Sequence, residues 1–260
     1  MTVTDLDFAD DLALLMEEME QAQEVLNRLE TEAERVGLYC NAKKTVFQTF
    51  NHDSPISIQA KNGERLQEVD NFRYLGGWTH SSSSDINIRK ALAWSACHKL
   101  RKVWSSTLHG PIKRRLFIAT VESVLLYGAE TWTLTKALEK QRNGCYTRML
   151  RMASNVSWKD HMTNEELYGD LPPVTLKIKQ RRLRLAGHCW RHKEEIASDL
   201  VLWEPLDGKR KRGRQRTTYI DNLLDDTGLD NTKELSALME DRKVWWNVVA
   251  DVGRPDGRPK

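Results

Sequence analysis

A run of serines at residues 81–84 separates two parts of the sequence whose apolar residues repeat with different periods. Before the run, short apolar stretches alternate with polar residues and turn signals, which is typical of strands arranged around one helix. After it, apolar residues recur every three or four positions, which is typical of helices. The sequence therefore predicts an α+β fold, with a mixed part over residues 1–80 and a mainly helical remainder.

The mixed part begins with a pattern typical of a tight β-hairpin. Residues 4–8 alternate loosely between polar and apolar, residues 12–16 are apolar, and "ADD" lies between them. Apolar residues at helical spacing then predict an amphipathic helix over residues 16–36, which Gly37 would end. Short apolar stretches predict three further strands, at residues 45–50, 56–60 and 72–79.

The later part is predicted to be helical almost throughout. We expect Asp85 to cap a helix that runs to Trp104, and Pro111 to lie in the first turn of the next helix. The prolines at 172–173 interrupt the chain, and capping-box spacing at Asn231 begins a last helix. Other helices are expected at residues 137–153 and 174–192, and the expected core includes Trp94, Trp104, Trp132 and Trp245.

Charge is distributed unevenly along the chain. Residues 1–70 carry 15 acidic and 6 basic groups, whereas residues 71–220 carry 28 basic and 13 acidic groups. A basic middle suggests a polyanionic partner, and the alternative is a solvated basic surface. The sequence shows no membrane-spanning apolar run, no secretory signal and no paired cysteine spacing. We therefore expect an intracellular protein, in the nucleus or the cytoplasm.

Two adjacent carboxylates, Asp10 and Asp11, stand at the predicted hairpin turn. Neighbouring negative charges repel each other, and a divalent metal ion that prefers oxygen ligands would compensate for this repulsion. A hairpin would raise both side chains towards one place, where such ions can act in phosphoryl transfer. Asp10 and Asp11 are therefore candidate Mg²⁺ ligands, but for such a pair taken by itself a solvated polar turn is the interpretation that we favour.

Several segments resemble, in the same order, the reverse transcriptases of non-LTR (LINE-type) retrotransposons. "FADD" at 8–11 resembles the [FY]xDD signature, "GLYCNAKKT" at 37–45 the next palm segment, and "FRYLGG" at 72–77 the primer grip. "RRLFIATVESVLLYGAETWTLTK" at 114–136 resembles the thumb, and "RRLRLAGHCWRH" at 181–192 with "GKRKRGRQRTTYIDNLL" at 208–224 resembles the closing segments. The resemblance implies a partial palm over residues 1–80, a helical thumb over 81–170 and a basic helical segment over 171–260.

This resemblance also implies an RNA-directed DNA polymerase that uses two metal ions for nucleotidyl transfer. Mg²⁺ would be the cofactor of the intact family, and an RNA template and a DNA primer would be the partners. Asp10 and Asp11 would be catalytic metal ligands, and Lys44 would assist the leaving pyrophosphate. Residues of the primer grip and thumb would contact nucleic acid: Tyr74, Leu75, Gly76, Lys113, Arg114 and Arg115.

One departure from the family pattern concerns a further catalytic aspartate, which the family carries on a strand well upstream of the hairpin. Only seven residues precede Phe8, and Asp5 and Asp7 belong to the strand that enters the same hairpin. We therefore expect this chain alone not to polymerise DNA. A non-enzymatic nucleic-acid-binding protein is the alternative function.

The last part of the chain offers a second set of nucleic-acid contacts. It combines arginines of a basic helix with a charged run that follows: Arg181, Arg182, Arg184, Lys209, Arg210, Lys211, Arg212, Arg214 and Arg216. Trp190 and Trp203 are near in sequence for stacking on bases. We favour nucleic-acid contact over a nuclear-import signal or a solvated loop, and expect binding to fall steeply with salt.

His188, Cys189 and His192 form a remaining cluster with metal-ligand chemistry. Two histidines four residues apart on a helix could share a zinc ion, with Cys145 as another candidate ligand. No second Cys/His pair stands at a matching interval. A helix face with a buried cysteine and exposed histidines is therefore the alternative that we favour.

Overall fold

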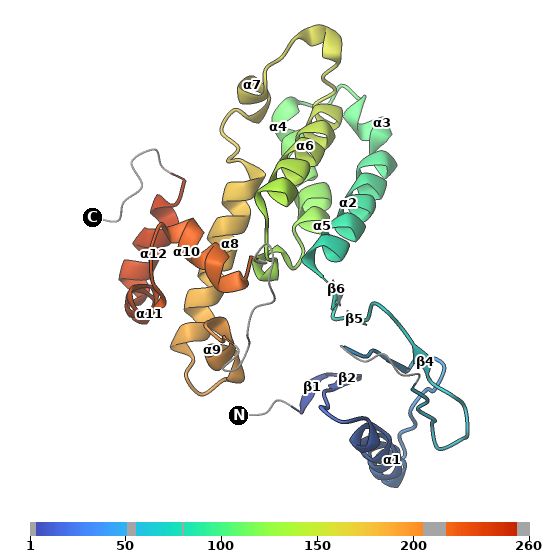
Figure 1. The fold of residues 1–260 in the computed structure, drawn as a ribbon. Helices are drawn as coiled ribbons and strands as arrows, with labels where there is room; N and C mark the ends of the chain where they lie inside the picture. Colours follow the sequence, from blue (N-terminus) through green and yellow to red (C-terminus); the bar gives the residue numbers. More distant parts are fainter. Residues whose placement is uncertain (1–3, 51–55, 80, 205–216, 254–260) are drawn as a thin grey trace. The chain divides into compact units, whose positions relative to one another are not determined.

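The computed structural model describes residues 4–50, 56–79, 81–204 and 217–253 (Figure 1). It divides into two compact units, Met1–Ser84 and Asp85–Lys260. The division falls at the end of the serine run, where the sequence changes from mixed to helical patterning. Each unit has a core of its own, and the two are described separately.

The first unit combines one helix with two-stranded sheets in its described residues. The strands are β1 (Asp5–Phe8), β2 (Asp11–Leu14), β3 (Val46–Phe47), β4 (Gln67–Glu68), β5 (Arg73–Tyr74) and β6 (Gly77–Trp78). β1 pairs antiparallel with β2 and β5 with β6, whereas β3 and β4 are parallel. Helix α1 (Met19–Arg35) buries Leu26 against Ile58, Ala60 and Leu66, because its apolar residues recur on one face.

The hairpin and the helix predicted for the first unit are confirmed. Gly37 follows the end of α1 with φ +80°, a backbone conformation that glycine adopts without strain. The strand predicted at 56–60 is wrong, because the structure has only an isolated bridge there, between Gln59 and Arg65. Residues 45–50 contribute only the short β3, and residues 72–79 fold back on themselves as the β5–β6 hairpin.

The second unit is helical in its described residues. Its first half holds α2 (Ser82–Lys99), α3 (Arg101–Trp104), α4 (Gly110–Phe117), the π-helix η1 (Ile118–Glu122), α5 (Ser123–Leu125), the 3-10 helix η2 (Ala129–Thr131) and α6 (Lys136–Ala153). Its second half holds the 3-10 helix η3 (Trp158–Asp160), α7 (Asn164–Tyr168), α8 (Val174–Arg191), α9 (Ile196–Val201), α10 (Tyr219–Thr227), α11 (Thr232–Glu240) and α12 (Arg242–Asp251). Within the described ranges, every helix is too short or too polar to cross a bilayer.

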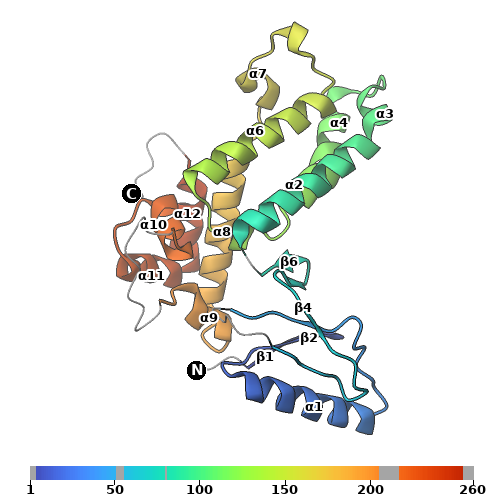
Figure 2. The same ribbon diagram turned by 45° about the vertical axis from the view of Figure 1, so that its right-hand side comes forward.

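Helix α8 links two hydrophobic cores of the second unit. Val174 and Ile178 pack in a core with residues of α2–α7, and Leu183 and Ala186 pack in another with α10–α12. Figure 2 shows α8 with α6 and α2 on one side and the C-terminal helices on the other. Of the tryptophans expected in the core, Trp104, Trp132 and Trp245 are each 2% exposed, and Trp94 is partly buried.

Helix boundaries differ from the prediction at the start of α2 and in the last predicted helix, and Leu100 divides the helix predicted to run to Trp104 into α2 and α3. Asp85 does not cap a helix; α2 already begins at Ser82, and the buried Asp85 carboxylate accepts a hydrogen bond of 2.6 Å from Trp132 Nε1. The predicted last helix is two helices, because the Asp241 side chain accepts hydrogen bonds from the amides of Lys243 and Val244 and so begins α12.

Candidate metal and nucleic-acid sites

The carboxylate pair lies at the tip of the β1–β2 hairpin. Phe8 pairs with Asp11, so Ala9 and Asp10 form a two-residue loop. Ala9 has φ +55°, a left-handed conformation that glycine adopts more readily; a positive φ at the first loop residue alone is the pattern of a type II′ turn. The turn presents Asp10 and Asp11 next to each other, and both are exposed.

The other carboxylates of this hairpin point elsewhere. Side chains alternate between the faces of a strand, so Asp5 and Asp7 share one face, whereas Asp11 shares the other with Phe8. Nowhere in the described ranges could three His, Cys, Asp or Glu side chains together hold a metal ion, and no ion pair there joins Asp10 or Asp11 to a cation. Two carboxylates fit a Mg²⁺ ion that completes its shell with water or phosphate oxygens.

The β5–β6 hairpin, which carries the predicted primer-grip residues, contacts the first hairpin. Leu75 and Gly76 form its two-residue loop, with φ of +47° and +82°. Beside the loop, the Tyr74 hydroxyl donates a hydrogen bond of 3.0 Å to the backbone carbonyl of Leu6 in β1. The structure thereby joins the strand that leads to Asp10 with a segment far along the chain.

Lys44 lies in a turn that precedes β3. Its amide donates to the Asn41 carbonyl at 2.9 Å, and the amide of Lys43 donates to Asn41 Oδ1 at 3.1 Å. Both lysine side chains are exposed. Among the described residues, no ion pair joins Lys44 to the carboxylates of the hairpin, so its part in catalysis stays a prediction.

The basic residues of α4 are engaged within the protein to different degrees. Lys113 is buried, and its ammonium donates to the carbonyls of Trp104 and Ser106 at 2.7 and 2.8 Å. Arg114 donates from its guanidinium to two carbonyls at the end of α7. Neither cation is directed at solvent, because each satisfies carbonyls at a helix end. Only Arg115 of these three is exposed.

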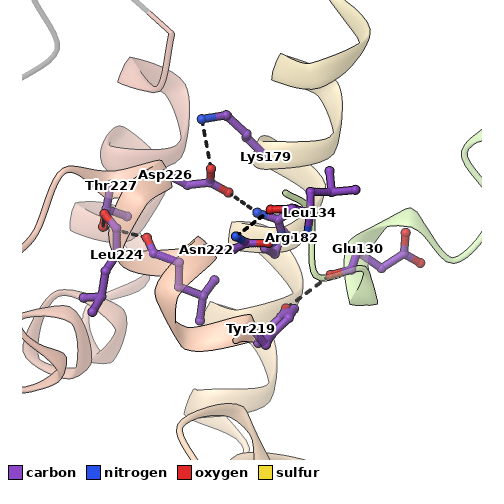
Figure 3. Close-up of polar contacts among 10 residues, drawn as sticks. Glu130, Leu134, Lys179, Arg182, Tyr219, Asn222, Leu224, Asp226 and Thr227 are labelled. Atoms are coloured by element: carbon purple, nitrogen blue, oxygen red, sulfur yellow. Dashed lines mark hydrogen bonds and ion pairs between the residues drawn. The ribbon is translucent and has the colours of Figure 1, made fainter. Parts of the chain in front are cut away.

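Arg182 of α8 is also a structural residue. It is 1% exposed, and its guanidinium donates to Asp226 of α10 at 2.6 Å (Figure 3). Lys179 lies 3.0 Å from the other oxygen of that carboxylate. Burial raises the pKa of Asp226, and the two cations oppose this effect. Arg182 therefore ties α10 to α8, and it is not available to a phosphate.

The same interface contains a pair of buried backbone contacts. The Asn222 side chain accepts from the amide of Leu134 at 2.6 Å and donates to the Leu134 carbonyl at 3.0 Å. Figure 3 shows Tyr219 beside this contact, with its hydroxyl directed at the backbone of Glu130. These contacts hold the start of α10 against the segment that follows η2.

Arg184 is the arginine of α8 that faces solvent. Its guanidinium lies 5.3 Å from the ring centroid of Trp246 in α12, and Trp246 is 60% exposed. Arg181, which is half-buried and donates to the Leu126 carbonyl, lines an open hollow of about 300 Å³ together with Arg184, Leu185 and Glu130. Trp246 was not predicted to contact nucleic acid, because the helical spacing of apolar residues drew attention to its buried neighbour Trp245.

The remaining candidates of this region are only partly described. The charged run Lys209, Arg210, Lys211, Arg212, Arg214 and Arg216 lies outside the described residues. Of the two tryptophans proposed for stacking, Trp203 is 61% exposed. Trp190 is partly buried and donates from its indole N–H to Glu240 at 2.9 Å.

His188 and His192 lie together at the end of α8. Their ring centroids are 4.2 Å apart, and both side chains are exposed. Cys189 is half-buried and packs against the second core, so it does not share their face. Cys145 is buried in the other core of this unit.

Comparison with known proteins gives one informative relative. The chain is 26% identical, over 265 aligned positions, to a protein of Caenorhabditis elegans. That relative is described as an uncharacterized transposon-derived protein. The match covers 95% of each chain, so it is not confined to one motif. No model of a known protein family matches the chain, and no solved structure matches it.

Proposed function

We propose that the chain is derived from a retroelement and that its first unit is part of the palm of a LINE-type reverse transcriptase. The transposon-derived relative supports such an origin over nearly the whole length. The observation that supports the finer proposal is the hydrogen bond from Tyr74 to Leu6, which joins the β5–β6 hairpin, with its segment that resembles a primer grip, to the β1–β2 hairpin of Asp10 and Asp11. A polymerase needs its metal ligands close to the primer end.

Asp10 and Asp11 would hold Mg²⁺ in this proposal. Their exposure at a tight turn and the lack of a paired cation in the described ranges suit a hard dication. Once bound, the ion would activate the attacking hydroxyl and stabilise the leaving pyrophosphate. Tyr74 would position the primer end, and Lys44 would steady the leaving group.

The reverse transcriptase family uses three carboxylates, and the described residues offer two at the hairpin tip. We therefore expect the 260-residue chain to bind a divalent ion without incorporating nucleotides. Primer extension on a primed RNA template, with Mg²⁺ or Mn²⁺, tests the second half of this statement. Incorporation that Asp10→Ala abolishes would show that the chain is a competent polymerase.

Metal binding is tested with Mn²⁺, whose free ion is counted by electron paramagnetic resonance. Asp10→Asn and Asp11→Asn should each weaken Mn²⁺ binding, because each removes one charged oxygen ligand. Asp7→Asn is the matched control, since Asp7 lies on the opposite face of the same hairpin. Equal Mn²⁺ affinity in all three variants and the unmodified chain would rule out the proposed metal site.

Nucleic-acid binding by the second unit is a second function, and it does not depend on the hairpin. The Arg184–Trp246 pair supports it, because an exposed guanidinium and an exposed indole ring together suit a phosphate and a base. Glu130, in the wall of the adjacent hollow, opposes phosphates there. An RNA template and a DNA primer are the partners that the resemblance implies.

Fluorescence anisotropy with a primed RNA template tests this function. Affinity should fall by orders of magnitude between about 50 and 200 mM salt, because neutralised phosphates release counterions. Arg184→Gln should weaken binding and lower the salt slope by about one, whereas Arg35→Gln should leave both unchanged. A flat salt response would contradict the proposal. Binding that persists in Asp10→Asn without nucleotide incorporation would favour the non-enzymatic function.

A further inference from the structure

The C-terminal end of α8 carries a histidine pair that neither proposed function uses. We propose that His188 and His192 form a two-histidine site for a divalent transition-metal ion, of the class that includes Ni²⁺ and Zn²⁺. Imidazole nitrogen is a preferred ligand of these ions, in contrast to the oxygen ligands that Mg²⁺ prefers. The site is thus chemically distinct from the carboxylate pair of the first unit.

Helix geometry brings the two rings together. His188 lies in the last turn of α8, and His192 is the residue that caps this helix. Residues four apart on a helix lie on the same side, and the ring centroids here are 4.2 Å apart. Both side chains are exposed, so an ion can reach them from solvent and small rotations of the rings can adjust the ligand distance.

A backbone contact fixes the protonation pattern of His192. Its Nδ1 lies 2.7 Å from the carbonyl oxygen of His188. A carbonyl oxygen only accepts hydrogen bonds, so Nδ1 carries the proton and the lone pair of Nε2 is left for a metal ion. Metal-binding histidines typically donate their other ring N–H in this way, which orients the ring before the ion arrives.

The charged neighbours of the pair are largely engaged elsewhere. Lys193 lies 3.1 Å from the Glu240 carboxylate, and Arg191 donates to the Met239 carbonyl at 3.0 Å. Arg184, one turn before His188, lies over the ring of Trp246. The exposed carboxylates of Glu194 and Glu195 follow directly and offset these cations. The local charge therefore does not strongly repel a divalent cation.

The site has two protein ligands in the described part of the chain, because no group of three metal-ligating side chains occurs there. Cys189 is not counted as a ligand, because it follows His188 directly and successive helical residues point about 100° apart. Water would complete the coordination. A bound ion would tie the last turn of α8 to its capping residue and so strengthen the connection that leads to α9.

Isothermal titration with NiCl₂ tests the site in the full chain, without an affinity tag and with the thiols reduced. We expect one site near unit stoichiometry, and affinity about tenfold weaker in His188→Ala and in His192→Ala. His109→Ala and His161→Ala are matched controls, since both residues are exposed histidines outside α8, and they should bind as the unmodified chain does. Absence of a unit site, or unchanged affinity in both α8 variants, would overturn the proposal.

A second measurement locates the ion without any substitution. Substoichiometric Cu²⁺ should broaden the NMR signals of the His188 and His192 rings before those of the other histidines. Circular dichroism would show whether His188→Ala and His192→Ala keep their helix content, as expected for exposed side chains. Earlier broadening of other histidine rings would contradict the assignment.

Discussion

Arg142 and Arg182 are each 1% exposed, but their surroundings differ. Arg182 pairs with Asp226, whereas the three guanidinium nitrogens of Arg142 have no hydrogen-bond partner and its charge lies 4.2 Å from the ring centroid of Trp132. Burial lowers the pKa of Arg142 to about 9. A basic group whose pKa is lower in the folded than in the unfolded state destabilises the folded protein at every pH below its folded-state pKa. The charge of Arg142 therefore lowers stability at neutral pH.

Replacing each arginine by methionine should therefore affect stability differently. Arg142→Met removes an uncompensated charge and keeps much of the side-chain volume, so the free energy of unfolding should stay the same or rise by about 1 kcal/mol. Arg182→Met leaves a buried carboxylate with only Lys179 as partner, and should cost about 3 kcal/mol. Urea denaturation of both variants measures this. Equal losses in the two variants would show that Arg142 is compensated in another way.

The sequence showed where cations are concentrated but not which of them face solvent. Lys113 and Arg182 belong to basic stretches that suggest phosphate contacts, yet both are buried. Their partners, the carbonyl of Trp104 and the carboxylate of Asp226, are set by tertiary packing. No local sequence pattern reveals such a partner. The position of Asp10 and Asp11 at an exposed turn was predictable, because a hairpin turn is formed by neighbouring residues.

Helices α8 and α12 approach closely at Gly187. A Cβ atom there would lie 2.1 Å from Trp245 Nε1, which donates to the Leu183 carbonyl. Gly187→Ala should therefore lower the free energy of unfolding by about 2–3 kcal/mol, although alanine is the better helix former. Gly144→Ala in α6 is the matched control, since no atom lies within 4 Å of its Cβ position, and it should stabilise by about 1 kcal/mol. Thermal denaturation compares the two, and a stabilising Gly187→Ala would contradict the close contact.

The caps of α7 and α12 should make both helices sensitive to acid. Backbone amides donate to Glu166 and Asp241 and lower the pKa of each carboxyl group. Because the pKa is lower in the folded state, their stabilisation is present above the ordinary carboxyl pKa and is lost as the pH falls through the lowered value.

The NMR shift of the Val244 amide should report this loss for α12 on titration from about pH 6 to pH 2. Asp241→Asn should remove the transition while keeping the side-chain acceptor. An unchanged titration in that variant would assign the transition to another group.

Helix positions were predictable where apolar residues recur on one face, as in α1, α6 and α8. The interruptions were not, because each depends on a single backbone residue. Leu100 leaves the helical conformation, with φ −93° and ψ 11°, and separates α2 from α3. Asp241 turns one predicted helix into α11 and α12 although the apolar spacing continues across it.

The two units differ in how much apolar surface they bury. The core of the first unit rests on Leu26, Ile58, Ala60 and Leu66, while Phe8 and Tyr39 of this unit are 62% and 80% exposed. Amides of α1 should therefore exchange with deuterium sooner than those of α6 and α8. Hydrogen-exchange mass spectrometry of the full chain tests this, and equal protection in all three helices would show that the units unfold together.

At the scale of the molecule, the change in periodicity at the serine run predicted where the two units divide. The contact between the hairpins could not be predicted, since Tyr74 and Leu6 are distant in sequence and no local pattern links them. The exposure of the basic side chains was partly predictable: Arg115 and Arg184 are exposed as expected, whereas Lys113 and Arg182 are buried.

Side chains of helix α8 pack in two hydrophobic cores, which restricts the mutations that this protein can accept during evolution. One residue inserted between Ile178 and Leu183 would rotate the rest of the helix by about 100°, so the packing of at most one core could be preserved. Outside close-contact positions such as Arg182 and Gly187, substitutions can accumulate along this helix, but insertions and deletions cannot. The spacing of its residues should therefore be inherited more strictly than their identities.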